Sequence, residues 1–216
     1  MNNIIERNYY TGTDSDGEFK IIQFQHHEVC FPPSIPELLN GQLVSLAISN
    51  RLAYLQHQIS QVVEFYKSKN IIDYRYTLEA ALVSMKRVMD DLVMSSYCMI
   101  FRDKVLETKH IEVDTYGSLF KNGKPTKVGK EILDKAIQPT DDFEQVLTEL
   151  VNSLKHSYLL PEAQLVWGAD FPTVVSIYVH RNKYGDEITY HNHSLGQIIM
   201  GFNNFVSNVV TLQKNL

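Results

Sequence analysis

An asparagine and a histidine in the segment 151–157 have types and a spacing suited to chemistry. Asn152 and His156 are four residues apart, so on a helix both side chains lie on one face, one turn apart. An imidazole can take or give a proton near pH 7, which makes His156 a candidate base. The structural alternative is that both side chains hydrogen-bond to neighbouring backbone, as buried polar groups usually do.

His191 and His193 form a second candidate, a metal site. Residues two apart in a strand point to the same side, so both imidazoles could bind one ion, with His180 or His156 completing a zinc shell. However, no carboxylate pattern accompanies these histidines, and we expect His193 to lie just beyond the end of its strand. Metal binding is therefore kept as an alternative, and we expect no cofactor.

Lysines recur at every third position between residues 121 and 130. No acidic residue separates Lys121, Lys124, Lys127 and Lys130. Lysine is a mobile point charge suited to contacts with phosphates, so the four side chains are candidates for binding RNA. The alternative is a solvated loop, since the run contains no aromatic residue on which a base could stack.

Around Asn152 and His156 the chain resembles the HEPN superfamily, helical bundles of which many members are ribonucleases of prokaryotic toxin and defence systems. Active members carry an arginine, then four to six residues, then the histidine, with a polar residue, often asparagine, directly after the arginine. Here Asn152 and His156 match this motif, but Val151, Leu150 and Glu149 occupy the positions open to the arginine. The resemblance thus implies the fold of this family without its catalytic cation.

The missing arginine decides between two readings of this resemblance. Metal-independent RNA cleavage needs a base for the 2′-hydroxyl proton and a cation for the charge that builds on the phosphate. An active enzyme would use His156 as base, Asn152 as orienting residue, and Lys155 or a lysine from the 121–130 loop as cation. Because the loss of one such electrostatic stabiliser typically costs about 100- to 1000-fold in rate, we expect a degenerate, non-catalytic HEPN-like module that binds RNA or a protein partner. A metal-independent ribonuclease and a His-rich metal-binding protein are the alternatives.

Two long amphipathic helices are the elements that must position these residues. Apolar residues at steps of three and four predict helices over about 36–68 and 73–105, which should pair antiparallel. A third helix is expected from about 140 to 158 and a last one from 194, where Ser194 and Gln197 have capping-box spacing. The fold class is therefore mainly α: a helical bundle built on two long antiparallel helices, with a small C-terminal β-hairpin.

The remaining segments are predicted from turn residues and alternation. Alternating apolar residues predict a hairpin over 173–192 and a short strand over 18–25. Glycines and a proline break any period in 106–138, which we expect to be a long loop region or a short hairpin. Residues 1–17 are polar and expected to be loosely held, and the whole chain, 1–216, is expected to form one domain.

Composition narrows the class of protein. The formal net charge of −5 excludes a protein whose whole surface is a cationic glove for nucleic acid. Apolar runs are too short to cross a bilayer, and two cysteines fit a reducing compartment, so we expect a cytoplasmic protein with no membrane contact. An apolar stripe left over on the long helices would favour a homodimer.

Overall fold

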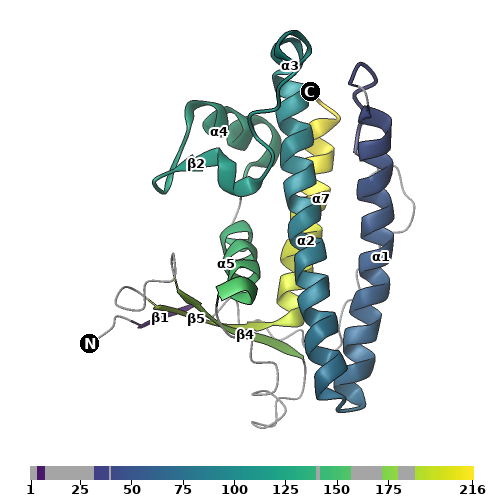
Figure 1. The fold of residues 1–216 in the computed structure, drawn as a ribbon, viewed down its shortest axis with the longest axis vertical. Helices are drawn as coiled ribbons and strands as arrows, with labels where there is room; N and C mark the ends of the chain where they lie inside the picture. Colours follow the sequence, from purple (N-terminus) through teal and green to yellow (C-terminus); the bar gives the residue numbers. More distant parts are fainter. Residues whose placement is uncertain (1–3, 8–31, 39, 140–141, 157–171, 180–187) are drawn as a thin grey trace. The chain divides into compact units, whose positions relative to one another are not determined.

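The computed structural model describes residues 4–7, 32–38, 40–139, 142–156, 172–179 and 188–216, with only the backbone described at 4–7 and 155–156 (Figure 1). Over these residues the chain is mainly helical, as predicted. None of the helices described is long and apolar enough to span a membrane. The contacts divide the chain into two compact units, which are described separately below, and the single domain expected from the sequence stays a prediction.

The predicted pair of long helices is confirmed. Helix α1 is Gly41–Lys67 and helix α2 is Ile71–Ile100 (Figure 1). Lys69 adopts a left-handed conformation with φ of 55°, which ends α1. The amide of Asp73 donates to Oδ1 of Asn70 (3.4 Å), so Asn70 caps the start of α2.

The buried faces follow the predicted spacing. On both long helices the residues at steps of three and four are inaccessible to solvent, and Val44, Tyr66 and Met99 at the ends of the stripes are half-buried. The fully buried members are Ile48, Leu52, Leu55, Ile59 and Val62 on α1, and Leu78, Leu82, Met85, Met89, Leu92 and Ser96 on α2. Burial of these side chains supplies the main free energy that holds the helices together.

Unit 1 contains a three-stranded sheet with the order β1-β5-β4, together with parts of the helices α1, α2, α5 and α7. Strand β4, Thr173–Val179, pairs antiparallel with β5, Ile188–Ser194, which confirms the predicted hairpin. The strand β1, Ile4–Arg7, runs parallel to β5 and was not expected within the polar start of the chain. The predicted strand 18–25 lies outside the described residues.

Helices α5 and α7 match the last two predicted helices. Helix α5 is Phe143–His156 and buries Val146, Leu147 and Leu150, while α7 is Leu195–Gln213. The hydroxyl of Tyr74, on α2, donates to the carbonyl of Thr173 on β4 (3.0 Å), which ties the sheet to a helix inside unit 1. Burial raises the pKa of Tyr74, so its hydroxyl stays protonated and remains a donor.

Unit 2 contains the other parts of the long helices and the segment that follows them. After α3, Arg102–Thr108, come a 3-10 turn η2, Tyr116–Leu119, strands β2, Phe120–Lys121, and β3, Lys124–Pro125, and helix α4, Lys127–Ile132, which continues into η3, Leu133–Ile137. The long loop expected over 106–138 is therefore wrong, although the short hairpin is present.

The physical reason for this correction is a helix cap and a tight turn, both formed by nearby residues. The side chain of Thr126 accepts from the amide of Gly129 (2.9 Å) and starts α4. Asn122 and Gly123 both have positive φ, 53° and 74°, which is the backbone of a tight two-residue hairpin turn. The glycines were taken as breaks, but here Gly123 builds the turn and Gly129 allows the close packing of a compact motif.

Candidate functional site

The predicted Asn152–His156 pair lies in the last turns of α5. Asn152 is half-buried, and the adjacent Ser153 hydroxyl donates to the carbonyl of Leu150 (2.6 Å). Lys155 and His156 belong to the helix, but their side chains lie outside the described part of the structure. The helical spacing is thus confirmed for the backbone, while the roles of Asn152, Lys155 and His156 stay predictions.

At the three positions where the HEPN resemblance would place an arginine, 149–151, the residues belong to the core or contact another side chain. Leu150 is fully buried and Val151 is 7% exposed, so both belong to the core. Glu149 lies beside His191, with Oε2 3.1 Å from Nε2 of the imidazole. None of the three positions supplies a cation.

The four predicted lysines lie together on one small motif, residues 115–132, which we term the lysine hairpin. Lys121 and Lys124 are paired across the β2–β3 ladder, and Lys127 and Lys130 are three residues apart on α4. All four side chains are exposed. Three elements therefore present four cations from a stretch of ten residues.

Close backbone packing fixes the shape of the lysine hairpin. The amide of Thr126 donates to the carbonyl of Leu119 (2.9 Å), and α4 passes directly over the same carbonyl. A Cβ atom on Gly129 would lie 2.0 Å from the Leu119 oxygen, well inside van der Waals contact. Only glycine at position 129 allows this approach.

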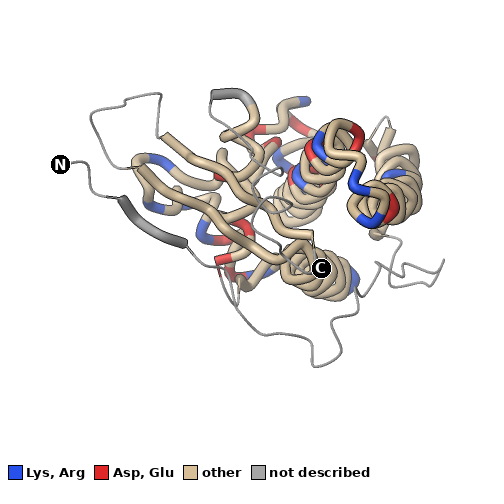
Figure 2. The backbone as a smooth tube through the Cα atoms, turned by 90° about the horizontal axis from the view of Figure 1, so that it is seen from below, with Lys and Arg blue, Asp and Glu red and all other residues tan. Residues whose placement is uncertain are grey.

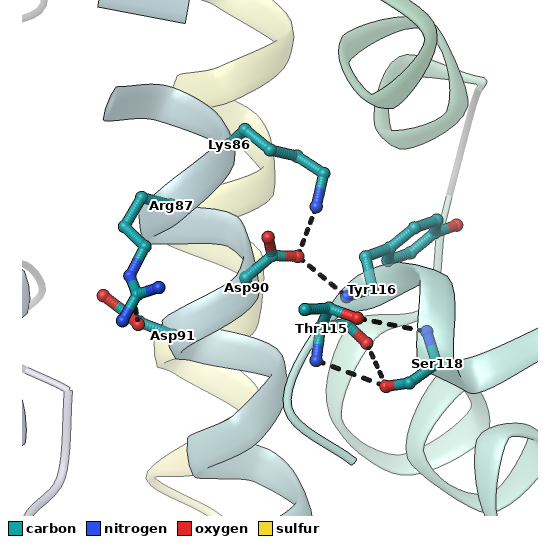
Figure 3. A network of polar contacts seen from close by, with 7 residues as sticks. All are labelled: Lys86, Arg87, Asp90, Asp91, Thr115, Tyr116 and Ser118. Carbon is teal, nitrogen blue, oxygen red and sulfur yellow. Dashed lines mark hydrogen bonds and ion pairs between the residues drawn. The ribbon is translucent and has the colours of Figure 1, made fainter. Parts of the chain in front are cut away.

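A carboxylate of α2 anchors the other end of the motif (Figure 3). Asp90 Oδ1 accepts from the backbone amide of Tyr116 (2.8 Å) and also pairs with the ammonium group of Lys86. Thr115 and Ser118 form a reciprocal capping box next to this contact. The turn that leads into β2 is therefore held by a partly buried ion pair and by its own side chains.

The lysine hairpin differs in charge from the long helices. No acidic residue occurs between Gly117 and Lys130, and none of the four lysines forms an ion pair with a described residue. In Figure 2, where the long helices are seen nearly end-on, both Lys or Arg and Asp or Glu segments lie on them. On α2, for example, Lys86 pairs with Asp90 and Arg87 with Asp91. The lysine hairpin thus carries charge that its own fold leaves available.

The two histidines of β5 meet a carboxylate that the sequence did not indicate. His191 and His193 are 0% and 1% exposed, and Nδ1 of His191 lies 2.9 Å from Nε2 of His193. On the other side of His191, Nε2 lies 3.1 Å from Glu149 Oε2, close enough for a charge contact but not aligned as a hydrogen bond. We term Glu149, His191 and His193 the histidine row.

The strand register limits the metal alternative. Strand β5 continues through Ser194, so His193 lies inside the strand, contrary to the expectation that the strand ends before it. The residues of β4 opposite His191 and His193 are Ser176 and Val174, and His180 lies outside the described residues. Within the described residues no group of three His, Cys, Asp or Glu side chains could hold a metal ion.

Sequence reasoning missed Glu149 and Asp90 as functional or positioning residues. Both contact residues far away in the chain, His191 and Tyr116, so no local spacing marks them. A local signal at Glu149 is Gln145, four residues earlier, whose Nε2 donates to Oε1 of Glu149 (2.7 Å).

Comparison with known proteins adds no family to this picture. No protein-family model matches the chain, and neither the curated proteins nor the solved structures give a match.

Proposed function

We propose that this chain is a non-catalytic, HEPN-like module that binds RNA through the lysine hairpin. The observation that carries the proposal is the group of four exposed lysines without acidic partners among the described residues. Ammonium groups held on a rigid motif can each displace a counterion from a phosphate, which is the main source of sequence-independent affinity for nucleic acid. Because the net charge of the whole chain is negative, phosphates should be attracted to this local patch and not to the surface in general.

The absence of catalysis is supported by the residues before Asn152. Two of the three positions open to the family's arginine are apolar and buried, and the third, Glu149, is negatively charged and lies beside His191. An enzyme built on His156 would have to obtain its cation elsewhere, from Lys155 or the lysine hairpin. The HEPN-like assignment itself rests on the Asn152 and His156 motif and on the two long helices.

Fluorescence anisotropy with a labelled single-stranded RNA of mixed sequence, in EDTA and at several salt concentrations, tests this proposal. We expect measurable binding that weakens with salt. Replacement of all four lysines by glutamine should reduce the slope of log affinity against log salt by about 3, because each phosphate contact in a single strand contributes about 0.7. Binding at low salt should fall at least about tenfold.

The matched control changes net charge equally at other exposed lysines, Lys67, Lys69, Lys109 and Lys214. This variant should keep most of the affinity and most of the salt slope. Equal losses in the two variants would show that only net charge matters and would overturn the assignment to the lysine hairpin. If the RNA is cleaved, and cleavage is lost in His156→Ala, the ribonuclease alternative holds instead.

A protein partner is the second candidate, and one observation favours it. Ile72, Tyr76 and Val83 are exposed at 68%, 63% and 48% and share one face of α2. If the chain binds no RNA, this apolar face is the surface to test for a partner. The homodimer predicted from the sequence stays a prediction, which light scattering coupled to size-exclusion chromatography would test.

A further inference from the structure

The contact between the two imidazole rings of the histidine row limits how many protons the two rings can carry. A neutral imidazole has one N–H group and one acceptor nitrogen, and an imidazolium has two N–H groups and no acceptor. Nδ1 of His191 and Nε2 of His193 are 2.9 Å apart, so one of the two must be the acceptor. The contact therefore requires that at least one of the two rings stays neutral.

The first proton on the pair has a place in the folded protein. With both rings neutral, one ring donates to the other across this contact, and which ring donates depends on the tautomers. After one proton is added to the pair, the contact still has one donor and one acceptor. Glu149 Oε2, 3.1 Å from Nε2 of His191, lies where it can act as the counter-charge for this proton.

The second proton has no such place. Two imidazolium rings would direct N–H groups at each other across 2.9 Å, with no acceptor between them. Both rings are removed from solvent, so water cannot screen the repulsion. The two rings must separate, or the second proton must stay off.

Described groups on four neighbouring elements lie around the row. On α5, Gln145 donates to Oε1 of Glu149 (2.7 Å) and holds the carboxylate in position. On β4, Ser176 lies opposite His191 in register and is not titratable, while on β1 Arg7 occupies the register position opposite His191. On α2, Tyr74 contacts β4 at Thr173 and remains neutral.

We propose that the histidine row is an acid-sensitive switch within unit 1, in which a second proton separates His191 from His193 and loosens β5 from β4. The pair is two residues apart on one strand, so its separation must disturb the strand that carries both rings. Unfolded chains bind a proton at each histidine near pH 6.5. Below that pH the folded state then binds one proton fewer than the unfolded state, and its stability falls as pH falls.

Denaturant unfolding of the full chain between pH 7.5 and 5.0 tests the switch against the variant His193→Gln. Glutamine can hydrogen-bond to Nδ1 of His191 but does not titrate. Below about pH 6 the folding equilibrium constant of the natural chain should fall about tenfold per pH unit more steeply than that of the variant. The control variant His110→Gln, at an exposed histidine, should keep the pH dependence of the natural chain.

A second variant covers the case in which His193→Gln does not fold. In Glu149→Gln the first proton loses its counter-charge, so the loss of stability should begin at higher pH and be steeper. Hydrogen exchange, compared with the intrinsic rate at each pH, should show lower protection of the β5 amides in acid in the natural chain. Identical pH dependence in the natural chain and in whichever of these variants folds, or unchanged protection of the β5 amides, would overturn the proposal.

Discussion

The lysine hairpin and the histidine row both gather titratable side chains, yet they treat charge in opposite ways. In the lysine hairpin four cations point to solvent, and the contacts that fix the motif are made by backbone, by Gly129 and by Asp90. In the histidine row the titratable groups contact one another and are themselves part of the core. Charge that is left in water is available to a ligand, whereas charge that is buried acts on stability.

The strongest test of this comparison disrupts the backbone packing of the lysine hairpin and leaves all four lysines in place. Gly129→Ala places a Cβ atom 2.0 Å from the carbonyl oxygen of Leu119, the acceptor of the Thr126 amide. In an exposed helix the same substitution would stabilise by up to about 1 kcal/mol. Here the steric conflict outweighs that gain, and we expect a loss of about 3 kcal/mol or more in the free energy of unfolding, measured by denaturant titration.

Gly117→Ala is the matched control for this substitution. The nearest atom to a Cβ on Gly117 is Oγ1 of Thr115 at 4.0 Å, so the methyl group has space. The free energy of unfolding should change by less than about 1 kcal/mol. Equal costs at both glycines would mean that the approach of α4 to Leu119 does not define the motif. Hydrogen exchange then shows whether the loss at Gly129 is confined to residues 115–137 or extends to β4 and β5.

A smaller effect is expected from the carboxylate anchor. Asp90→Ala leaves the amide of Tyr116 without its acceptor and the ammonium of Lys86 without its counter-charge, and the side chains of Lys86 and Asp90 are each 13% exposed. We expect the free energy of unfolding to fall by about 2–3 kcal/mol. Asp90→Asn keeps an oxygen for the Tyr116 amide and should lose about half as much. RNA affinity should fall in the alanine variant if the anchor positions the lysines. An unchanged affinity would show that the anchor stabilises the fold but is not needed for RNA binding.

The helices were predictable from sequence because their signal is local. The steps of three and four that carry Ile48, Leu52 and Leu55 recur along α1, and burial follows them closely. The hairpin of β4 and β5 was predictable for the same reason, since alternation and turn residues lie within one segment. Each of these signals lies within or next to the element that it predicts.

The parts that sequence did not reveal depend on contacts between distant segments. Strand β1 pairs with β5, about 180 residues away, and nothing in Ile4–Arg7 identifies that partner. Gly129 was taken as a break because its close neighbour, Leu119, is defined only after the chain folds. The lysines were visible as a pattern, but their exposure and the lack of acidic partners among the described residues could be read only from the structure.

The smallest effect is expected next to the anchor, at Asp91, on the opposite side of α2 from Asp90 in Figure 3. Burial raises the pKa of Asp91, even though Arg87 (3.2 Å) and Arg51 (3.6 Å) act to lower it. The folded protein therefore disfavours the ionised carboxylate, and this group's contribution to stability grows as pH falls from the raised folded-state value towards the ordinary value near 4.

Asp91→Asn removes that disfavoured charge. Its two partners keep contact with water, since the side chains of Arg87 and Arg51 are 62% and 37% exposed, so neither is left as a buried, uncompensated cation. We expect a change within about 1 kcal/mol at pH 7, together with loss of the gain in acid, measured as the difference in unfolding free energy between pH 7 and pH 4.5. A cost at pH 7 as large as that of Asp90→Ala would contradict this, because it would mean that the pair with the arginines outweighs the cost of burying the carboxylate.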